Sequence, residues 1–254
     1  MLAQERRMKI LELLQEEGSA RVSYLSEAFG VSEPTVRQDL ERLEQEGHII
    51  REHGGAYLRS VSSQVRSLSL QHMEHIEKKE VIARRAAEFI DNGDRLILDS
   101  GSTVTEISKL LKEKEELTIV TNALNIALIV GAEYGFELFV TGGEFKAPTL
   151  SLTGPKAQSS LENVYVDKLF LATGGISPSL ELTYPGLADL PVKRAMIEAA
   201  TTVFLVADST KIGKRSFASL GSMGDVDVFI TDSGIDSESR RRIEELGVAV
   251  VIAE

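Results

Sequence analysis

Small hydroxyl residues and a glycine follow a short apolar run near residue 100. Residues 95–99 have the composition of a strand, and a Ser-Gly-Ser-Thr sequence at residues 100–103 then opens a helical stretch. A glycine turn at a helix start exposes backbone N–H groups, which act with the hydroxyls and the positive end of the helix dipole to attract an anion. The loop therefore predicts phosphate binding, although serine and threonine are also ordinary helix caps.

Basic residues stand at two comparable positions further along the chain. Asp189 is placed to cap a helix, so Lys193 and Arg194 fall near the helix start, where a cation opposes the helix dipole unless an anion is nearby. Lys211 follows an apolar run at residues 203–207 through a polar turn. Solvated surface lysines are the alternative for each position. Together with the loop near residue 100, they favour a small phosphorylated ligand.

These positions depend on a sheet, which the pattern from residue 77 onward predicts. The strand candidates are residues 95–99, 117–121, 136–140, 168–172, 203–207, 226–231 and 248–252. The helical stretches are residues 80–90, 103–111, 123–130, 155–161, 191–200 and 238–246. Apolar strands separated by helices indicate a mostly parallel sheet covered on both faces, which is a Rossmann-like α/β fold. Such sheets bind ligands at the carboxyl ends of their strands.

Length and composition set the class of protein. The chain has 254 residues, of which 43% are hydrophobic and 26% charged, as in an ordinary globular protein with one large domain or a small domain plus a medium one. Without cysteine it can form no disulfide, thiol nucleophile or Cys-ligated zinc site, so a reducing cytoplasm is the simplest location. The apolar run at residues 248–253 is far shorter than the roughly 20 residues that cross a bilayer.

The first 58 residues follow a helical period and end in a hairpin signal. A second helix with Ser23 as its N-cap ends at Gly30, and a third starts at Ser32. A Gly-Gly turn at residues 54–55 then joins two short extended runs. Two short helices joined by a tight turn and followed by a hairpin predict a winged helix-turn-helix domain. Residues 59–76, with several serines and no period, read as a linker to the α/β domain at 77–254.

The third helix has the pattern of a DNA-reading helix. Val36, Leu40 and Leu43 fall on one face and can pack inward, which leaves hydrogen-bond donors on the other face to enter the major groove. Arginine can bond guanine and glutamine can bond adenine in bidentate fashion. The candidate DNA contacts are Ser32, Thr35, Arg37, Gln38 and Arg42 on this helix, with Arg51 and His53 on the wing. A purely structural three-helix domain is the alternative.

The charge balance does not by itself indicate nucleic-acid binding. The whole chain has a formal net charge of −11, which argues against a general polyanion binder but not against one locally placed DNA-reading helix. Residues 1–59 hold eight basic and eleven acidic residues, an unusual balance for a DNA-binding domain. The charge is nevertheless segregated, because the outward face of the third helix carries two arginines.

Several motifs, in this order and spacing, resemble one protein family. The N-terminal ones include Phe29-Gly30-Val31-Ser32, Thr35-Val36-Arg37-Gln38-Asp39-Leu40 and His53-Gly54-Gly55-Ala56. The later ones include Asp99-Ser100-Gly101-Ser102-Thr103, Thr141-Gly142-Gly143-Glu144, Val192-Lys193-Arg194-Ala195 and Ala207-Asp208-Ser209-Thr210-Lys211. Over nearly its whole length, the chain resembles the DeoR family of bacterial transcription regulators.

The resemblance implies that the second domain, itself similar to ribose-5-phosphate isomerase, senses a phosphorylated sugar or a related metabolite. Carried across by position, it implies that Gly101, Ser102 and Thr103 hold the phosphate, with Lys193 and Lys211 near the sugar or its anion. The full set of candidate effector-binding residues is Asp99, Gly101, Ser102, Thr103, Thr105, Gly174, Gly175, Lys193 and Lys211.

An isomerase with an appended helix-turn-helix domain is the main rival hypothesis. The isomerase places acidic residues after the strand that corresponds to residues 168–172, where this chain has Thr173-Gly174-Gly175-Ile176 and no carboxylate. The glycine N–H groups there can still contact a ligand. An aldose–ketose isomerase needs a carboxylate to move a proton between adjacent carbons, so the sequence predicts a regulator and no enzyme.

The sequence thus predicts a repressor of a carbohydrate catabolic operon, without cofactor or metal. Its partners would be double-stranded operator DNA, a phosphorylated effector and further copies of itself, because a small reading head gains specificity from two half-sites. His72 and His75 are spaced to share a helical face, but two histidines in a linker are more often solvated than bound to metal. A ligand-binding module whose first domain contacts another protein is a further alternative.

Overall fold

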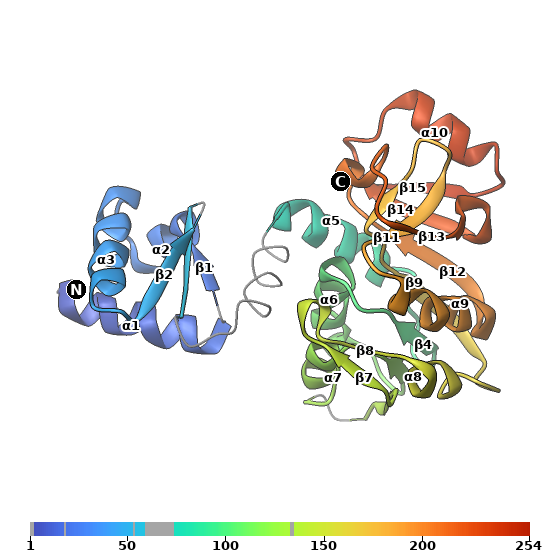
Figure 1. Cartoon of the computed structure of the whole chain (residues 1–254), viewed down its shortest axis with the longest axis horizontal. Helices are drawn as coiled ribbons and strands as arrows, with labels where there is room; N and C mark the ends of the chain where they lie inside the picture. The colour runs from blue at the N-terminus through green and yellow to red at the C-terminus, as the bar shows by residue number, and fades with distance from the viewer. Residues whose placement is uncertain (1–2, 18, 53, 59–73, 133–134) are drawn as a thin grey trace. The chain divides into compact units, whose positions relative to one another are not determined.

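The chain folds into two compact units that divide between Glu74 and His75 (Figure 1). The computed structural model describes residues 3–17, 19–52, 54–58, 74–132 and 135–254. Most of the expected linker, residues 59–73, lies outside the described residues. The exact domain boundaries at residues 58 and 76 therefore stay predictions, and each unit is considered by itself.

The N-terminal unit is a winged helix-turn-helix fold. Its elements are α1 (Ala3–Glu17), β1 (Ser19–Arg21), α2 (Val22–Phe29), α3 (Glu33–Gln45), β2 (Ile49–Glu52) and β3 (Gly55–Leu58). The three strands form an antiparallel sheet in the order β1-β3-β2. Its core is formed by apolar side chains of all three helices and of the sheet, such as Leu14, Leu25, Leu40 and Ile49. Strand β1 was not predicted, because three residues are too few to show a period.

A tight turn between α2 and α3 fixes the start of the third helix. Gly30 has φ +61°, a left-handed conformation that favours glycine, and ends α2. The Ser26 hydroxyl donates a 2.6 Å hydrogen bond to the Val31 carbonyl and holds the turn closed. Ser32 is the extended N-cap of α3, as predicted. The predicted N-cap of α2 is wrong: the helix begins at Val22, and Ser23 lies inside it.

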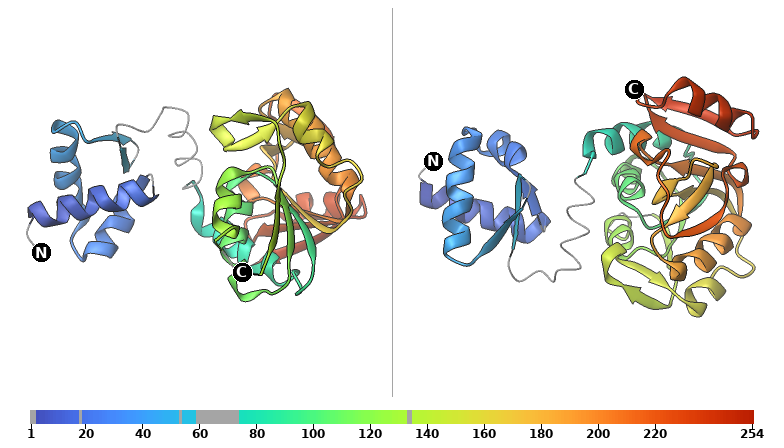
Figure 2. Two further views of the ribbon diagram at one scale, coloured as in Figure 1. Left: turned by 90° about the horizontal axis from the view of Figure 1, so that it is seen from below. Right: turned by 45° about the horizontal axis from the view of Figure 1, so that its top comes forward.

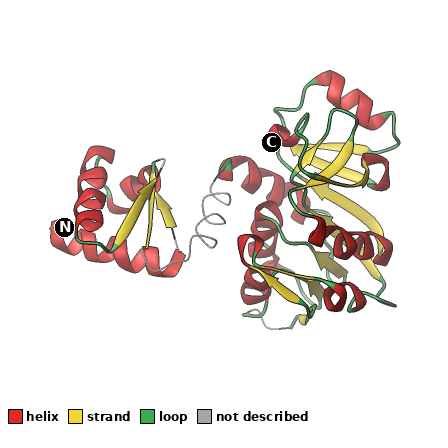
Figure 3. Ribbon diagram, viewed as in Figure 1, coloured by secondary structure: helices red, strands yellow, loops and turns green. Residues whose placement is uncertain are grey.

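The C-terminal unit is built on a seven-stranded sheet in which every neighbouring pair is parallel (Figures 1 and 3). The strand order is β15-β14-β12-β9-β4-β5-β6. The strands are β4 (Arg95–Leu98), β5 (Thr118–Thr121), β6 (Glu137–Val140), β9 (Val166–Leu171), β12 (Ala200–Val206), β14 (Val228–Asp232) and β15 (Ala249–Ala253). All seven were predicted, to within a few residues at their ends.

Helices cover both faces of this sheet (Figure 2). The helices are α5 (Ile76–Ala87), α6 (Ser102–Lys109), α7 (Leu124–Val130), α8 (Pro155–Ser159), α9 (Leu190–Ala199) and α10 (Ser237–Glu244). One buried cluster joins α5, α6 and α7 to one face, and a second joins α8, α9 and α10 to the other. Alternate residues of β4 enter the two clusters, Ile97 one and Leu96 and Leu98 the other, as a two-faced strand requires. The predicted α/β fold is confirmed.

Shorter elements around the sheet were not predicted. A hairpin joins β7 (Glu144–Lys146) to β8 (Ser151–Thr153), and a small antiparallel sheet has the order β10-β11-β13. Its strands are β10 (Gly175–Ile176), β11 (Glu181–Tyr184) and β13 (Ala218–Ser222). Short 3-10 turns are η1 (Leu111–Glu113), η2 (Ala147–Thr149), η3 (Leu187–Asp189), η4 (Ser209–Lys211) and η5 (Met223–Asp225). Strands of two to five residues carry too few positions for a readable period.

Candidate functional site

The third helix of the N-terminal unit presents one buried and one exposed face. Val36, Leu40 and Leu43 are buried in the domain core, as their spacing predicts. On the opposite face Arg37, Gln38 and Arg42 are exposed, and Ser32 and Thr35 stand at the helix start. Because the apolar residues hold the helix on the domain, its other face is free to carry donors into a groove.

A buried acidic residue explains part of the unfavourable charge balance. Asp39 lies on the inner side of α3, where its carboxylate accepts a 2.6 Å hydrogen bond from Arg6 Nε and lies 3.7 Å from an Arg7 nitrogen. This carboxylate therefore belongs to the packing of α1 on α3 and adds no charge to the exposed face. A net-charge count cannot reveal this, since it gives no information on burial.

Each candidate DNA-contacting arginine has a glutamate partner. Arg37 pairs with Glu33 at 2.9 Å and Arg42 with Glu46 at 3.0 Å, both along exposed helix turns. On the wing, the backbone N–H of Arg51 donates to Glu44, whose carboxylate also lies 3.9 Å from the Arg51 guanidinium. Exposed pairs of this kind are worth about 0.2–1 kcal/mol, so a phosphate or guanine can displace the glutamate at low cost.

The remaining DNA candidates are partly described. The Ser32 and Thr35 hydroxyls hydrogen-bond to one another at 2.9 Å across the first turn of α3. No side chain caps the backbone of this helix start, so its first N–H groups remain able to meet a phosphate. His53 lies outside the described residues.

In the C-terminal unit, the predicted anion loop joins β4 to α6. Gly101 is the N-cap of α6, and no side chain caps this helix. The Gly101 carbonyl accepts hydrogen bonds from both the backbone N–H and the hydroxyl of Thr105, so Thr105 closes the first turn. The N–H groups of Ser102 and Thr103 precede the first helical hydrogen bond and have no helical acceptor. The loop can therefore offer them to an anion.

Only glycine fits at position 101. A Cβ atom added there would lie 2.4 Å from the Cβ of Ala172, in the segment that follows β9. Neighbouring side chains also hold the loop: the Asn122 side chain accepts from the backbone N–H of Ser100, and Asn125 donates to the Thr105 hydroxyl at 2.8 Å. These contacts hold the loop in place without a ligand, and the Thr105 hydroxyl links the Gly101 carbonyl to Asn125.

A buried ion pair lies beneath this loop. The Lys193 ammonium, on the first turns of α9, is 2.6 and 2.5 Å from the two carboxylate oxygens of Asp99 at the end of β4. The Ala172 backbone N–H donates to the same carboxylate at 3.0 Å. Burial raises the pKa of the Asp99 carboxyl above its ordinary value, and the attraction of the Lys193 ammonium opposes that rise.

Tyr184 closes one side of the pair. Its ring centroid lies 4.7 Å from the Lys193 ammonium, and its hydroxyl donates a 2.6 Å hydrogen bond to the Ala172 carbonyl. Burial and the Asp99 charge together raise the pKa of the Tyr184 phenol well above its usual value. Asp99 and Lys193 were predicted as separate candidates. Their contact could not be predicted, because β4 and α9 are far apart in the chain and only the fold brings them together.

Gly174 lies in the turn between β9 and β10, and Gly175 is the first residue of β10, at the same edge of the sheet. Their N–H groups already have acceptors, the Thr183 carbonyl at 3.0 Å and the Thr173 hydroxyl at 3.3 Å. A Cβ at position 175 would lie 2.5 Å from the Lys214 carbonyl. Close packing of this turn therefore explains both glycines, and their contact with a ligand stays a prediction.

The loop after β12 carries Lys211 and is tied to α5. Lys211 ends η4, and its ammonium has no hydrogen-bond or ion-pair partner within the described ranges. Two residues earlier, Ser209 receives a 2.9 Å hydrogen bond from Lys78 of α5, whose ammonium also lies 2.8 Å from Asp232. The sequence pattern gave no sign of this link, since Lys78 sits in an ordinary charged helix start.

A second salt bridge fixes the start of α9. Asp189 does occupy the predicted N-cap position, but its side chain does not cap the helix. Instead its carboxylate pairs with Lys146 of the hairpin formed by β7 and β8. The carboxylate thus leaves the helix start uncapped and joins the hairpin to the segment that carries Lys193.

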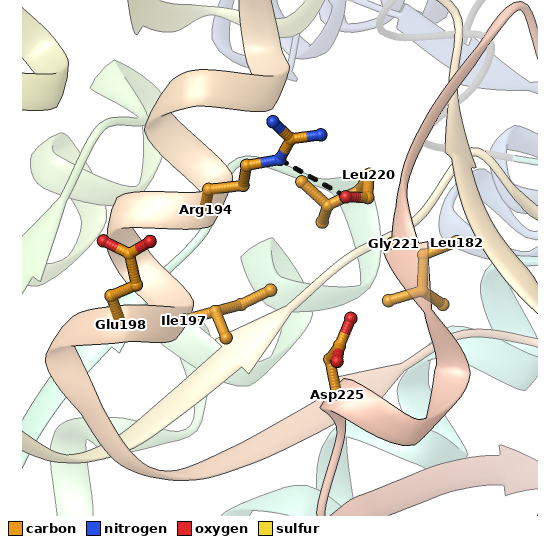
Figure 4. Close-up of a pocket in the computed structure, with 7 residues that line it drawn as sticks. All are labelled: Leu182, Arg194, Ile197, Glu198, Leu220, Gly221 and Asp225. Carbon is orange, nitrogen blue, oxygen red and sulfur yellow. Dashed lines mark hydrogen bonds between the residues drawn. The ribbon is translucent and has the colours of Figure 1, made fainter.

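A pocket of about 210 Å³ lies between α9 and the small sheet (Figure 4). Arg194 lines it and donates from Nε to the Leu220 carbonyl at 3.3 Å. Glu198 and Asp225 also line the pocket, and their negative charges oppose a phosphate there. The pocket is therefore a poorer anion site than the loop at Gly101, and Arg194 is turned toward it.

Metal sites and membrane-spanning helices were also sought among the residues that the structure describes. Within these ranges no three His, Asp or Glu side chains gather in a way that can hold a metal ion. No helix in them is both long enough and apolar enough to cross a membrane.

The fold and these two sites define a class of protein, a helix-turn-helix transcription regulator with an α/β ligand-sensing domain. Residues 6–62 match the model of the DeoR-like helix-turn-helix domain, and residues 74–233 match that of the DeoR C-terminal sensor domain. The chain belongs to the DeoR family, and the predicted resemblance is confirmed.

Curated relatives extend over almost the whole chain. The HTH-type transcriptional regulator GlpR of Haloferax volcanii is 36% identical, covering 99% of this chain and 98% of its own length. The glycerol-3-phosphate regulon repressor of Escherichia coli K12 is 33% identical over 90% of each chain. Both are regulators, in agreement with the prediction of a regulator and no enzyme.

A solved structure of D-ribose-5-phosphate isomerase in complex with phospho-erythronic acid is also similar. It is 19% identical, with a TM-score of 0.41, and the match covers 54% of each chain.

Proposed function

We propose that this protein is a cytoplasmic repressor that binds operator DNA through α3 and releases or retains it according to a phosphorylated metabolite bound at the Gly101 loop. The family supplies the class of regulator. One observation supports the ligand class. The start of α6 has no side-chain cap, it lies at the carboxyl edge of the sheet, and its glycine, Gly101, cannot be replaced without a clash.

In this proposal the loop residues and the two lysines have different roles in binding. The N–H groups and hydroxyls of Ser102 and Thr103 take the phosphate oxygens, and Lys211 supplies a cation that is not already paired. The charge of Lys193 is neutralised by Asp99, and this ion pair holds α9 against the end of β4, next to the loop. Sugar phosphates and glycerol phosphates share the dianion that this arrangement would bind. A relative named for the glycerol-3-phosphate regulon supports a small phosphorylated polyol or sugar as the effector.

The same proposal describes how α3 holds its target. Arg37, Gln38 and Arg42 read base edges in the major groove, while Ser32, Thr35 and the helix start hold phosphates. A homo-oligomer places two such helices on the half-sites of one operator. The effector changes DNA affinity only by the difference in its affinity for the two arrangements of the protein.

The test combines DNA selection with a panel of metabolites. Double-stranded DNA selected from a random pool by the full-length protein would show the operator as an inverted or direct repeat. Gel-shift titration of that DNA would then be repeated with glycerol 3-phosphate, several sugar phosphates, the unphosphorylated compounds and inorganic phosphate. We expect one phosphorylated compound to change the apparent Kd, and its unphosphorylated form to have no effect. If no DNA is selected, the proposal of operator binding is wrong. If none of the phosphorylated compounds changes the apparent Kd for DNA, the proposal of a phosphorylated effector is wrong.

The isomerase alternative is tested with the same compounds. Incubation of each sugar phosphate with the protein, followed by NMR, separates binding from conversion. We expect line broadening without new product signals. Turnover at a catalytic rate would overturn the proposal in favour of an enzyme.

A further inference from the structure

The β6 strand forms one edge of the seven-stranded sheet. It spans Glu137–Val140 and pairs in parallel with β5. Among the described strands, none pairs with its outer side. A free strand edge presents a row of unpaired backbone groups, which is a template for pairing with another chain.

The hydrogen bonds of β6 show which backbone groups point outward. The N–H groups of Glu137 and Thr141 donate inward, to the carbonyls of Leu117 and Thr121 of the β5 side. In a parallel ladder alternate residues face the same neighbour, so Phe139 also faces β5. The N–H and C=O groups of Leu138 and Val140 therefore point away from the sheet, toward the free edge.

Apart from Glu137 at its start, the side chains of β6 do not protect this edge. Phe139 is 52% exposed and Val140 is 42% exposed, and the strand contains no lysine or proline. Large apolar side chains are also exposed nearby in the chain, with Leu128 of α7 at 78% and Phe145 of β7 at 53%. Natural sheets usually guard a free edge with charge, proline or a bulge. An apolar edge whose one charge, that of Glu137, stands at its end indicates a strand that is covered in the assembled protein.

We propose that two copies of this chain pair through β6, antiparallel and centred on Phe139, so that one sheet runs through both. The inference rests on the homo-oligomer of the proposed function and names its interface. In this register Leu138 of each copy lies opposite Val140 of the other. The outward N–H and C=O groups of both residues then form a complete set of antiparallel hydrogen bonds.

Charge and shape agree with this register. Phe139 meets its own copy at the two-fold axis as a non-hydrogen-bonded pair, the closer kind, where two aromatic rings pack well. The one charged residue of the strand, Glu137, lies opposite Thr141 of the other copy, so no like charges oppose each other. A two-fold interface needs such self-complementarity.

The opposite edge of the sheet, β15, is the rival interface. It also ends the strand order, but most of its side chains are only partly exposed, and Val250 and Val251 pack on the two buried clusters. Since Ala249 donates inward to the Asp227 carbonyl, the N–H of Ile252 points outward in the same way as that of Val140. Ile252 is therefore the matched control for variants of Val140, and Val251, whose N–H faces β14, is the matched control for Phe139→Cys.

Cysteine cross-linking tests the register directly, because the chain contains no cysteine. In the proposed pair the two Cα atoms at position 139 lie about 4.5 Å apart, within disulfide range, whereas those at position 140 are diagonal neighbours at about 7–8 Å, beyond it. We expect Phe139→Cys in the full chain to form a disulfide dimer under mild oxidation. Val140→Cys and Val251→Cys should remain uncross-linked.

Backbone substitution tests the hydrogen bonds. Val140→Pro removes an outward N–H without removing a bond to β5, and Phe139→Lys places two like charges at the axis. Each should raise the dissociation constant of the oligomer, measured by sedimentation, roughly tenfold or more, while Ile252→Pro should not. Circular dichroism and thermal melting check that the variants fold.

The outcomes separate this interface from the proposed function. Cross-linking at Phe139 alone supports the pairing. An oligomer that cross-links only through Val251→Cys, or whose dissociation constant is unchanged by both Val140→Pro and Phe139→Lys, would overturn it. A chain that is monomeric at all concentrations, yet binds its DNA and responds to a phosphorylated compound, would overturn the interface and leave the regulator standing.

Discussion

The ammonium of Lys193 and the carboxylate of Asp99 form a buried ion pair at the carboxyl edge of the sheet, with both oxygens within 2.6 Å of the nitrogen. The family resemblance places Lys193 near the sugar or its anion, and that contact stays a prediction. In the structure the charge of Lys193 is paired with that of Asp99, and the pair joins β4 to α9 next to the anion loop. Loss of one partner would leave the other charge buried without compensation, at a cost of about 3–5 kcal/mol.

We therefore predict that Lys193→Ala destabilises the C-terminal unit by roughly 3–5 kcal/mol. The double variant Asp99→Asn, Lys193→Ala should recover a large part of that loss, because it removes both charges together. Urea unfolding of the wild type, both single variants and the double variant would give the coupling energy. Equal stability of Lys193→Ala and the wild type would show that the pair is not formed in solution.

A second prediction concerns the glutamate that holds Arg37. Glu33→Gln frees the arginine and removes a negative charge from the DNA-facing side of α3, so operator binding should become roughly two- to fivefold tighter. Arg37→Ala should weaken binding by about 1–3 kcal/mol and lower its salt dependence if the residue contacts a phosphate. Gel-shift titration at several salt concentrations measures both effects.

Matched controls for this pair are available in α10. Arg241 and Glu245 form an exposed pair with the same i,i+4 spacing as Glu33 and Arg37. Glu245→Gln changes the net charge of the chain by the same amount as Glu33→Gln, and should leave DNA affinity unchanged. If both variants tighten binding equally, the effect is one of overall charge, and Arg37 has no special role.

The periodic parts of the fold were predictable from the sequence, and the reasons are physical. Strands such as β4 bury a continuous apolar run, and helices such as α3 bury apolar residues along one face; both leave a pattern in the chain. The elements that escaped prediction, such as β1 and the hairpin of β7 and β8, are three residues long and held by pairing with distant segments. Their structure depends on partners that local sequence does not specify.

The candidate site was predictable to the same extent. The Gly101 loop and the two lysines carry local signals, a strand end followed by glycine and hydroxyls or a basic residue at a helix start. Which charges are already paired depends on tertiary contacts over long sequence distances, such as Lys193 with Asp99 and Lys78 with Asp232. Likewise, the burial of Asp39 against Arg6 could not be read from a count of charges.

A third prediction tests the anion loop itself. Gly101→Ala places a methyl group against Ala172 and pushes the loop away from its position, so the response to the phosphorylated effector should be lost. Gly142→Ala is the control, since a Cβ there would meet nothing closer than 4.0 Å and its φ is ordinary. Calorimetric titration with the effector found in the metabolite screen gives the two affinities. An unchanged affinity in Gly101→Ala would place the ligand elsewhere.

The last prediction follows from the link between α5 and the loop that carries Lys211. Burial acts to raise the pKa of Asp232, but hydrogen bonds from Lys78, Ser209 and Gly234 outweigh it and lower this pKa to about 2, from an ordinary value of 3.8. A carboxylate whose pKa is depressed by folding stabilises the folded state above its unfolded pKa, and that stabilisation disappears as the pH falls through the folded value.

Stability should therefore decline between about pH 4 and pH 2, in part through Asp232. Lys78→Met removes the main partner, so the variant should be less stable at pH 7, by about 1 kcal/mol for a half-exposed pair, and should lose less of its stability over that pH range. Arg95→Met is the matched control. Asp167 also has a pKa of about 2, but its partner is Arg95 and the pair lies at the amino ends of the strands, away from the Ser209 turn. Since Lys78 donates to Ser209 and Arg95 does not, Lys78→Met but not Arg95→Met should also weaken the effect of effector on DNA binding. Equal effects of the two variants on that response would show that this link does not carry the signal.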